Sequence, residues 1–323
     1  MLRGLAMGAA DVVPGVSGGT IAFITGIYDK LIGSLNNIDH HALKLFFTGK
    51  WKALAERINL GFLVALFSGV LIAIVSLAKL ITYMLATYPE AVWSFFFGLV
   101  AASAVVIGGQ LPRKDWKVWL ALVIGVVIAL LIVTASAMSM PDTPLYSFIA
   151  GAIAIIAMIL PGISGSFILV ILNKYSYILG IVSNLPSGIK AVISGLKEGG
   201  IGEALKQASA YQLWDLAAFA AGCFVGLIAF AKVLNWLFKH YRNITMALLT
   251  GFMVGSLWKV WPWKLTTSTY LDRHGVEKPL TQANVLPEHM DSYFALCLAV
   301  AIFGFLFVYF LEKRLGAKMQ DPA

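Results

Sequence analysis

The sequence predicts an all-α membrane protein that crosses the bilayer several times and is built from two inverted repeats. Hydrophobic residues make up 59% of its 323 residues and charged residues only 12%, whereas a soluble domain carries about 25% charged residues. Long apolar runs alternate with short charged segments, as in polytopic membrane proteins. A glycine-rich hexapeptide also occurs twice inside apolar text, and matched breaks of this kind mark the two halves of many transporters.

The two hexapeptides are nearly identical, and each interrupts an apolar segment. PGVSGG runs from Pro14 to Gly19, and PGISGS runs from Pro161 to Ser166, 147 positions later (161 − 14). Proline ends the preceding helix, and the small residues permit a tight reversal. The hydrocarbon interior tolerates such backbone only where it is buried in protein or lines a cavity. Each broken segment is therefore expected to be a re-entrant hairpin or a kinked span, at a site between the repeats.

The repeat extends beyond the hexapeptides. The block from Gly69 to Ser103 matches the block from Gly222 to Ser256 at a slightly longer offset of 153 (222 − 69), so a duplicated unit is predicted. The first unit, 1–140, has a re-entrant hairpin at about 2–36 and helices at about 60–86, 90–110 and 115–137. The second unit, 141–323, has a re-entrant hairpin at about 145–184 and helices at about 211–238, 243–261 and 291–312. Each of the six helices is long enough to span a bilayer, for which about 20 residues suffice.

Basic residues indicate how the chain is oriented. They gather in the loop 40–57, around Arg113 and Lys114, near Arg242 and at the C-terminal end. Cytoplasmic loops carry an excess of Lys and Arg, so these loops and both termini are placed in the cytoplasm. The six helices then cross the membrane in alternating directions only if each broken segment enters and leaves on the same side. Each unit therefore has three spans, so the second unit is inverted relative to the first. The net charge of +8 reflects this orientation rather than nucleic-acid binding.

The repeated motif has the chemistry of an anion site. A turn of Gly and Ser before a helix presents several backbone N–H groups in one direction, and the helix dipole adds its positive end. Hydroxyl groups add donors, and glycines let a bulky phosphate approach the backbone. The expected phosphate-binding residues are Gly15, Ser17, Gly18, Gly19, Thr20, Gly162, Ser164, Gly165 and Ser166. The alternative is that these small residues only let two hairpins cross closely.

Charged residues in or beside the apolar segments are further candidates. Asp11 lies three residues before Pro14 in the first broken segment, and Met158 takes the equivalent position in the second. An intramembrane carboxylate is costly, so Asp11 is expected to carry a coupling proton or sodium ion or to cap the local turn. Lys79 and Lys232 are equivalent residues inside apolar helices that can neutralise a phosphate or snorkel to opposite interfaces. Lys174, which flanks the second broken segment, is expected to snorkel.

The stretch from Gly8 to Ala22 (GAADVVPGVSGGTIA), with PGISGSF from Pro161 to Phe167, closely resembles the bacterial "domain of unknown function 368" membrane family. Its members are described as PopT-type polyprenyl-phosphate transporters. The resemblance covers essentially the whole chain and implies a flippase that returns undecaprenyl phosphate, the lipid carrier of cell-wall precursors, across the bacterial cytoplasmic membrane. Asn173 stands where the family pattern has glycine. The implied mechanism is alternating access to a midplane phosphate site formed by the two motifs.

Two other classes of protein stay open. Undecaprenyl-pyrophosphate phosphatases also have paired Pro-x-Ser-type re-entrant motifs, but their chemistry needs an acid/base group and a cation on the leaving phosphate. No His or Arg follows either motif, and no paired glutamates occur near them, so we expect no enzyme, catalytic residue, metal site or organic cofactor. A small-anion transporter or channel is the other class. The expected partners are the lipid and the bilayer, and not nucleic acid.

Overall fold

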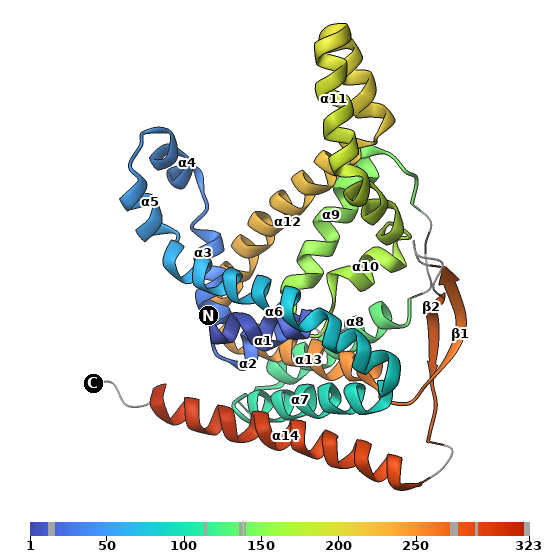
Figure 1. Ribbon diagram of the computed structural model, residues 1–323. Coiled ribbons are helices and arrows are strands. Elements are labelled where there is room, and N and C mark those ends of the chain that lie inside the picture. Colours follow the sequence, from blue (N-terminus) through green and yellow to red (C-terminus); the bar gives the residue numbers. More distant parts are fainter. Residues whose placement is uncertain are drawn as a thin grey trace.

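A computed structural model describes residues 1–11, 17–112, 115–135, 138, 140–271, 277–287 and 290–319. Within these ranges the chain forms helices α1 to α14 and one two-stranded hairpin (Figure 1). Six of these helices are long and apolar enough to cross a membrane. The predicted class, a helical protein with several membrane spans, is therefore confirmed.

The two broken segments and the helices after them follow the same order in each half of the chain. The first half contains α1 (Leu2–Asp11), α2 (Gly18–Ile24), α3 (Tyr28–Asn36), α4 (His40–Phe47), α5 (Trp51–Arg57), α6 (Leu60–Thr87), α7 (Pro89–Gly109) and α8 (Trp116–Val133). The second half contains α9 (Pro144–Ile159), α10 (Gly165–Ile171), α11 (Tyr175–Ala210), α12 (Leu213–His240), α13 (Arg242–Val260), β1 (Lys264–Leu271), β2 (Glu277–Asn284) and α14 (Ser292–Met319).

The candidate spans differ in one respect from those expected. By length and hydropathy they are α6, α7, α8, α11, α12 and α14 among the described residues, so α11 takes the place expected for α13. Much of α13 is buried, including Thr245, Thr250 and Ser256, and it packs against α8 and α7. A helix that is surrounded by protein rather than by lipid can carry more polar side chains, which accounts for the lower hydropathy of α13.

The two halves repeat in backbone conformation as well as in sequence. Helices α6 and α12 each have 28 residues and follow a residue in the left-handed region, Asn59 (φ 52°) and Gln212 (φ 54°). Gly26 (φ 67°) precedes α3, and its counterpart Asn173 (φ 54°) precedes α11. Asparagine is one of the few residues other than glycine that tolerate this conformation. Asn173 can therefore replace the glycine of the family pattern.

Equivalent helix pairs hold the fold together. Within the first half α1 packs on α6, and within the second half the equivalent helices α9 and α12 pack together. Two further pairs join the halves, because α7 packs on α14 and α8 packs on α13 (Figure 1). Glycines permit the close approach, because a Cβ at Gly98 would meet the Ala301 carbonyl oxygen and a Cβ at Gly251 would meet that of Leu122. The two halves are thus interlocked. The inverted orientation of the second half stays a prediction.

The segment after α13 forms an antiparallel hairpin, in which Lys264 of β1 lies opposite Asn284 of β2. The indole N–H of Trp261 donates to the carbonyl oxygen of Val285 at 2.8 Å, and the Asn284 side-chain amide donates to that of Trp258 at 2.7 Å. Threonine and tyrosine in β1 suit an extended strand. The charge pattern predicts only a loop here, so the hairpin is a local addition to the predicted helical fold.

Candidate functional site

The structure brings the two glycine-rich motifs into direct contact. The Oγ1 of Thr20 accepts a hydrogen bond from the N–H of Gly162 at 2.8 Å. The Oγ of Ser17 donates to the carbonyl oxygen of Met158 at 3.0 Å. Ser17 is 1% exposed and Thr20 is 0% exposed, so these bonds lie in a dry environment, where a polar group without a partner is costly. The motifs therefore form one junction between the two halves.

In the first motif, the protein itself occupies several of the expected phosphate donors. Ser17 caps α2 by accepting the N–H of Gly19 at 3.1 Å, which satisfies one free amide of the first turn. Asp11 accepts the N–H of Gly18 at 2.7 Å through Oδ1 and so caps the same turn. A Cβ on Gly19 would lie 2.6 Å from the carbonyl oxygen of Ile159. In this conformation the residues of the first motif pack closely against the second half of the chain. A phosphate can bind there only if it displaces the Ser17 hydroxyl and the Asp11 carboxylate from the N–H groups of Gly19 and Gly18.

The second motif has hydroxyl groups that are more open to a ligand. Ser164 precedes α10 without capping it through its side chain, and its Oγ lies 2.8 Å from the Oγ of Ser166. Ser164 is 8% exposed and Ser166 is exposed. Gly162 has a φ of 89°, in the region that favours glycine, and a Cβ there would lie 2.6 Å from the Oγ of Ser256. Close packing thus requires glycine in this motif too, but Ser166 and, to a small extent, Ser164 remain accessible from outside the protein.

The remaining site residues are placed as follows. Gly15 lies outside the described residues, and so does the side chain of Lys79. Lys232 is exposed on α12, and within the described part of the chain no hydrogen bond or ion pair joins it to either motif. Gly165 is buried, and a Cβ there would lie 2.7 Å from the Ala154 carbonyl oxygen. The structure therefore gathers the two motifs, but it does not bring Lys232 to them.

Lys174 is buried rather than snorkelling. Its side chain is 0% exposed, and its Nζ donates to the carbonyl oxygen of Pro141 and to Oδ1 of Asp142, both at 2.6 Å. Nζ also lies 4.7 Å from the centroid of the Tyr177 ring. The snorkelling prediction is wrong because the chain before α9 supplies a carbonyl and a carboxylate that satisfy the ammonium group within the protein.

Two lysines that the sequence did not single out lie around the end of α13, and one of them contacts the residue that follows the second motif. The Nζ of Lys259 is 4.2 Å from the centroid of the Phe167 ring, and Phe167 follows Ser166 in α10. The Nζ of Lys264 is 3.5 Å from the centroid of the Trp93 ring and donates to the carbonyl oxygen of Lys259 at 2.7 Å. In sequence they are only two bases near the end of an apolar run, which is also the pattern of interfacial lysines.

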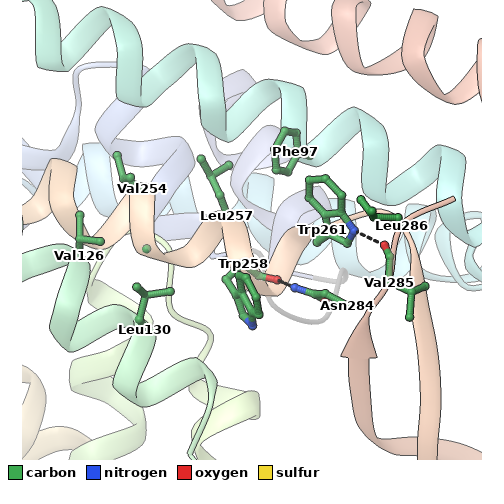
Figure 2. Close-up of a pocket in the computed structure, with 11 residues that line it drawn as sticks. Phe97, Val126, Leu130, Val254, Leu257, Trp258, Trp261, Asn284, Val285 and Leu286 are labelled. Carbon is green, nitrogen blue, oxygen red and sulfur yellow. Dashed lines mark hydrogen bonds between the residues drawn. The ribbon is translucent and has the colours of Figure 1, made fainter.

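An apolar pocket of about 440 Å³ lies between α7, α8, α13 and the residues at the base of the hairpin (Figure 2). Its lining residues are Phe97, Val126, Leu130, Val254, Gly255, Leu257, Trp258, Trp261, Asn284, Val285 and Leu286. Trp258 and Trp261, which resemble an interfacial belt in the sequence, thus form part of its wall. With Asn284 as the single polar side chain among these residues, the pocket suits hydrocarbon better than a charged headgroup.

Residues 7–278 match the family model described as undecaprenyl phosphate translocase-like. The chain belongs to this family. A relative named polyprenyl-phosphate transporter from Vibrio cholerae serotype O1 is 40% identical over 318 residues, which cover 97% of this chain and 95% of the relative. A second relative of that name, from Staphylococcus aureus, is 30% identical over 274 residues and covers 81% of this chain and 85% of the relative. No solved structure matches.

The family membership agrees with the resemblance seen in the sequence. In this member of the undecaprenyl phosphate translocase-like family, the motifs meet at the junction of the two halves, through Thr20 and Gly162. The first motif is closed by hydrogen bonds within the protein, whereas Ser164 and Ser166 lie at the edge of the second. Two serine hydroxyl groups, with the Lys259 ammonium group against the next residue, Phe167, have the chemistry to bind a phosphate.

Proposed function

We propose that this protein moves polyprenyl phosphate, the lipid carrier used in envelope synthesis, across the bacterial cytoplasmic membrane. The observation that carries the proposal is the 40% identity, over 97% of the chain, to a relative named polyprenyl-phosphate transporter. Six candidate membrane spans suit a substrate that stays within the bilayer. Two broken helices that meet at the junction of a repeat also suit transport, because such junctions hold the substrate sites of many transporters.

The physical problem in moving this lipid is its headgroup. Hydrocarbon solvates the prenyl tail well, but a phosphate in hydrocarbon carries a large desolvation penalty. The protein therefore needs to shelter only the phosphate and to open the shelter alternately to each side. In the conformation described, the bonds from Thr20 to Gly162 and from Ser17 to Met158 close the junction. Opening it frees the Thr20 hydroxyl and the Gly162 N–H to bind the phosphate.

Both motifs bind the phosphate in this mechanism. Ser164 and Ser166 receive the headgroup from outside the cell, the side from which the charge pattern predicts the second broken segment to open, and the first motif completes the site when the junction opens. The residues that contact phosphate are then those of both motifs, Gly15, Ser17, Gly18, Gly19, Thr20, Gly162, Ser164, Gly165 and Ser166. Both termini face the cytoplasm, and a proton or sodium gradient acts through Asp11, which is released from Gly18 as the turn opens. No organic cofactor takes part.

The test is a leaflet-accessibility assay on vesicles that contain the purified protein and a labelled polyprenyl phosphate. We expect the wild type to equilibrate the label between leaflets, and we expect Ser164→Ala/Ser166→Ala to slow this about tenfold or more, because two donors to a charged group are lost. Ser183→Ala is the matched control, since Ser183 is exposed and its hydroxyl donates only to the Gly180 carbonyl oxygen nearby. A folded double variant with the full wild-type rate contradicts the site.

The same preparation separates the alternative functions. Release of phosphate from undecaprenyl pyrophosphate by the purified protein contradicts the transporter and supports a phosphatase. Flux of inorganic phosphate or chloride that is independent of the lipid supports a small-anion transporter.

A further inference from the structure

Lys259 and Lys264 lie around the end of α13, and the Lys259 ammonium group lies against Phe167, the residue that follows the second motif. Helix α13 ends at Val260, and after a short turn β1 begins at Lys264, so the second lysine stays close to the end of the helix. The Nζ of Lys264 donates to the carbonyl oxygen of Lys259 at 2.7 Å and lies 3.5 Å from the centroid of the Trp93 ring. The Nζ of Lys259 lies 4.2 Å from the centroid of the Phe167 ring.

Neither ammonium group is paired with a carboxylate among the side chains that the structure describes. Glu90, one helical turn before Trp93, instead accepts a hydrogen bond from the Tyr293 hydroxyl at 3.1 Å. Burial and the positive charge of Lys259 lower the pKa of Lys264, which lies in the hairpin outside the helices, to about 7. Two like charges held together repel each other, and a bound anion relieves that repulsion through charge-assisted hydrogen bonds.

The lysine pair is present in only one half of the repeat. At the offset of 153, the positions equivalent to Lys259 and Lys264 are Val106 and Leu111. The first motif instead has a carboxylate, Asp11, bonded to its turn. The two motifs thus have surroundings of opposite charge, and an anion is attracted to the second motif rather than to the first.

We propose that Lys259 and Lys264 bind the phosphate monoester headgroup of the lipid as it enters the protein, before it reaches Ser164 and Ser166. This inference rests on the proposed function and adds residues to the same site. A phosphate monoester carries a charge of about −1.5 to −2 at pH 7 and three acceptor oxygens, which can accept hydrogen bonds from both ammonium groups. Aromatic faces hold an ammonium group weakly and leave its N–H groups free to turn toward such acceptors.

The test is a titration of the full-length protein in nanodiscs with farnesyl phosphate, farnesol and inorganic phosphate. For Lys259→Gln/Lys264→Gln we expect the affinity for farnesyl phosphate to fall on the order of tenfold to a hundredfold, while farnesol binding is unchanged. Lys259→Arg/Lys264→Arg retains the charges and is expected to bind within a few-fold of wild type. Lys197→Gln, which removes an exposed lysine of α11, is expected to bind like wild type.

The outcomes separate this inference from the proposed function. If the double glutamine variant binds farnesyl phosphate like wild type while Ser164→Ala/Ser166→Ala does not, the lysine inference is wrong and the transporter stands. If the wild type neither binds farnesyl phosphate nor moves the lipid in vesicles, both are wrong. Inorganic phosphate that binds as tightly as farnesyl phosphate overturns the lipid headgroup as the ligand. If the double variant fails to fold, the single variant Lys259→Gln is the test. Its affinity for farnesyl phosphate is expected to fall on the order of tenfold, and wild-type affinity would contradict the inference.

Discussion

Replacing Thr20 with valine tests whether the hydrogen bond between the motifs holds the two halves of the protein together. Thr20 is 0% exposed, and its Oγ1 is the acceptor for the N–H of Gly162 at 2.8 Å. Valine has nearly the same shape as threonine but has no hydroxyl group. The substitution therefore removes the acceptor and leaves the packing almost unchanged, so the buried N–H of Gly162 loses its partner.

The expected loss follows from that missing partner. A buried donor without an acceptor costs about 1–3 kcal/mol, so Thr20→Val is expected to lower the free energy of unfolding by about 2 kcal/mol. Thr20→Ser keeps the acceptor and loses one buried methyl group, which costs about 1 kcal/mol. The hydrogen-bond account therefore predicts that serine is tolerated better than valine, whereas a site that only requires volume predicts the reverse order.

The measurement is reversible unfolding of the purified protein in mixed detergent micelles, followed by circular dichroism. Thr134→Val is the matched control, because Thr134 is exposed at the C-terminal end of α8 and its hydroxyl donates to the Leu130 carbonyl oxygen in the last turn of that helix. That control is expected to change stability by less than about 0.5 kcal/mol. If Thr20→Val is as stable as the control, or more stable than Thr20→Ser, the hydrogen bond does not hold the junction.

Three further predictions concern the second half. Gly162→Ala is expected to lower the free energy of unfolding by about 2 kcal/mol in the same assay, because Gly162 has a φ of 89° and a new Cβ would lie 2.6 Å from the Oγ of Ser256. Gly180→Ala is the control and should not destabilise the protein, because nothing lies within 4 Å of a Cβ at that position. Asp142→Asn is expected to lower the free energy of unfolding by roughly 2 kcal/mol, a value between those of exposed and buried ion pairs. It is expected to destabilise the protein more than Lys174→Met does. The reason is that Asp142→Asn leaves the fully buried Lys174 without a counter-charge, whereas Lys174→Met leaves only Asp142, which is 56% exposed. Burial and the neighbouring Lys259 lower the pKa of Lys264 to about 7, so its ammonium group loses its proton between about pH 6.5 and about pH 8.5. Calorimetric titrations with farnesyl phosphate should therefore show an affinity that falls as the pH rises over this range. Lys264→Arg should bind with little change over this range, since the guanidinium stays charged.

Features that depend on local sequence were the ones that could be predicted. Apolar runs of sufficient length predict membrane helices, and the protein class follows from them. Proline and glycine inside such a run predict a break, and α2 and α10 begin within the two hexapeptides at Gly18 and Gly165. The resemblance to a transporter family rested on the same residues and agrees with the family that the chain matches.

Features that depend on pairing between distant segments were not predictable. The bond from Thr20 to Gly162 joins residues 142 positions apart, and nothing in either hexapeptide indicates that its donors are occupied by the other. The burial of Lys174 depends on where Asp142 lies in the fold. The contacts of Lys259 with the Phe167 ring and of Lys264 with the Trp93 ring likewise join segments that are far apart in the sequence.

The central claim is tested most directly by the movement of polyprenyl phosphate between leaflets in vesicles that contain only this protein. The account predicts that the protein speeds equilibration of polyprenyl phosphate, does not speed that of the uncharged prenyl alcohol beyond protein-free vesicles, and releases no phosphate from polyprenyl pyrophosphate. Wild-type protein that is folded in the bilayer, yet leaves polyprenyl phosphate in its original leaflet with and without a proton or sodium gradient, contradicts it.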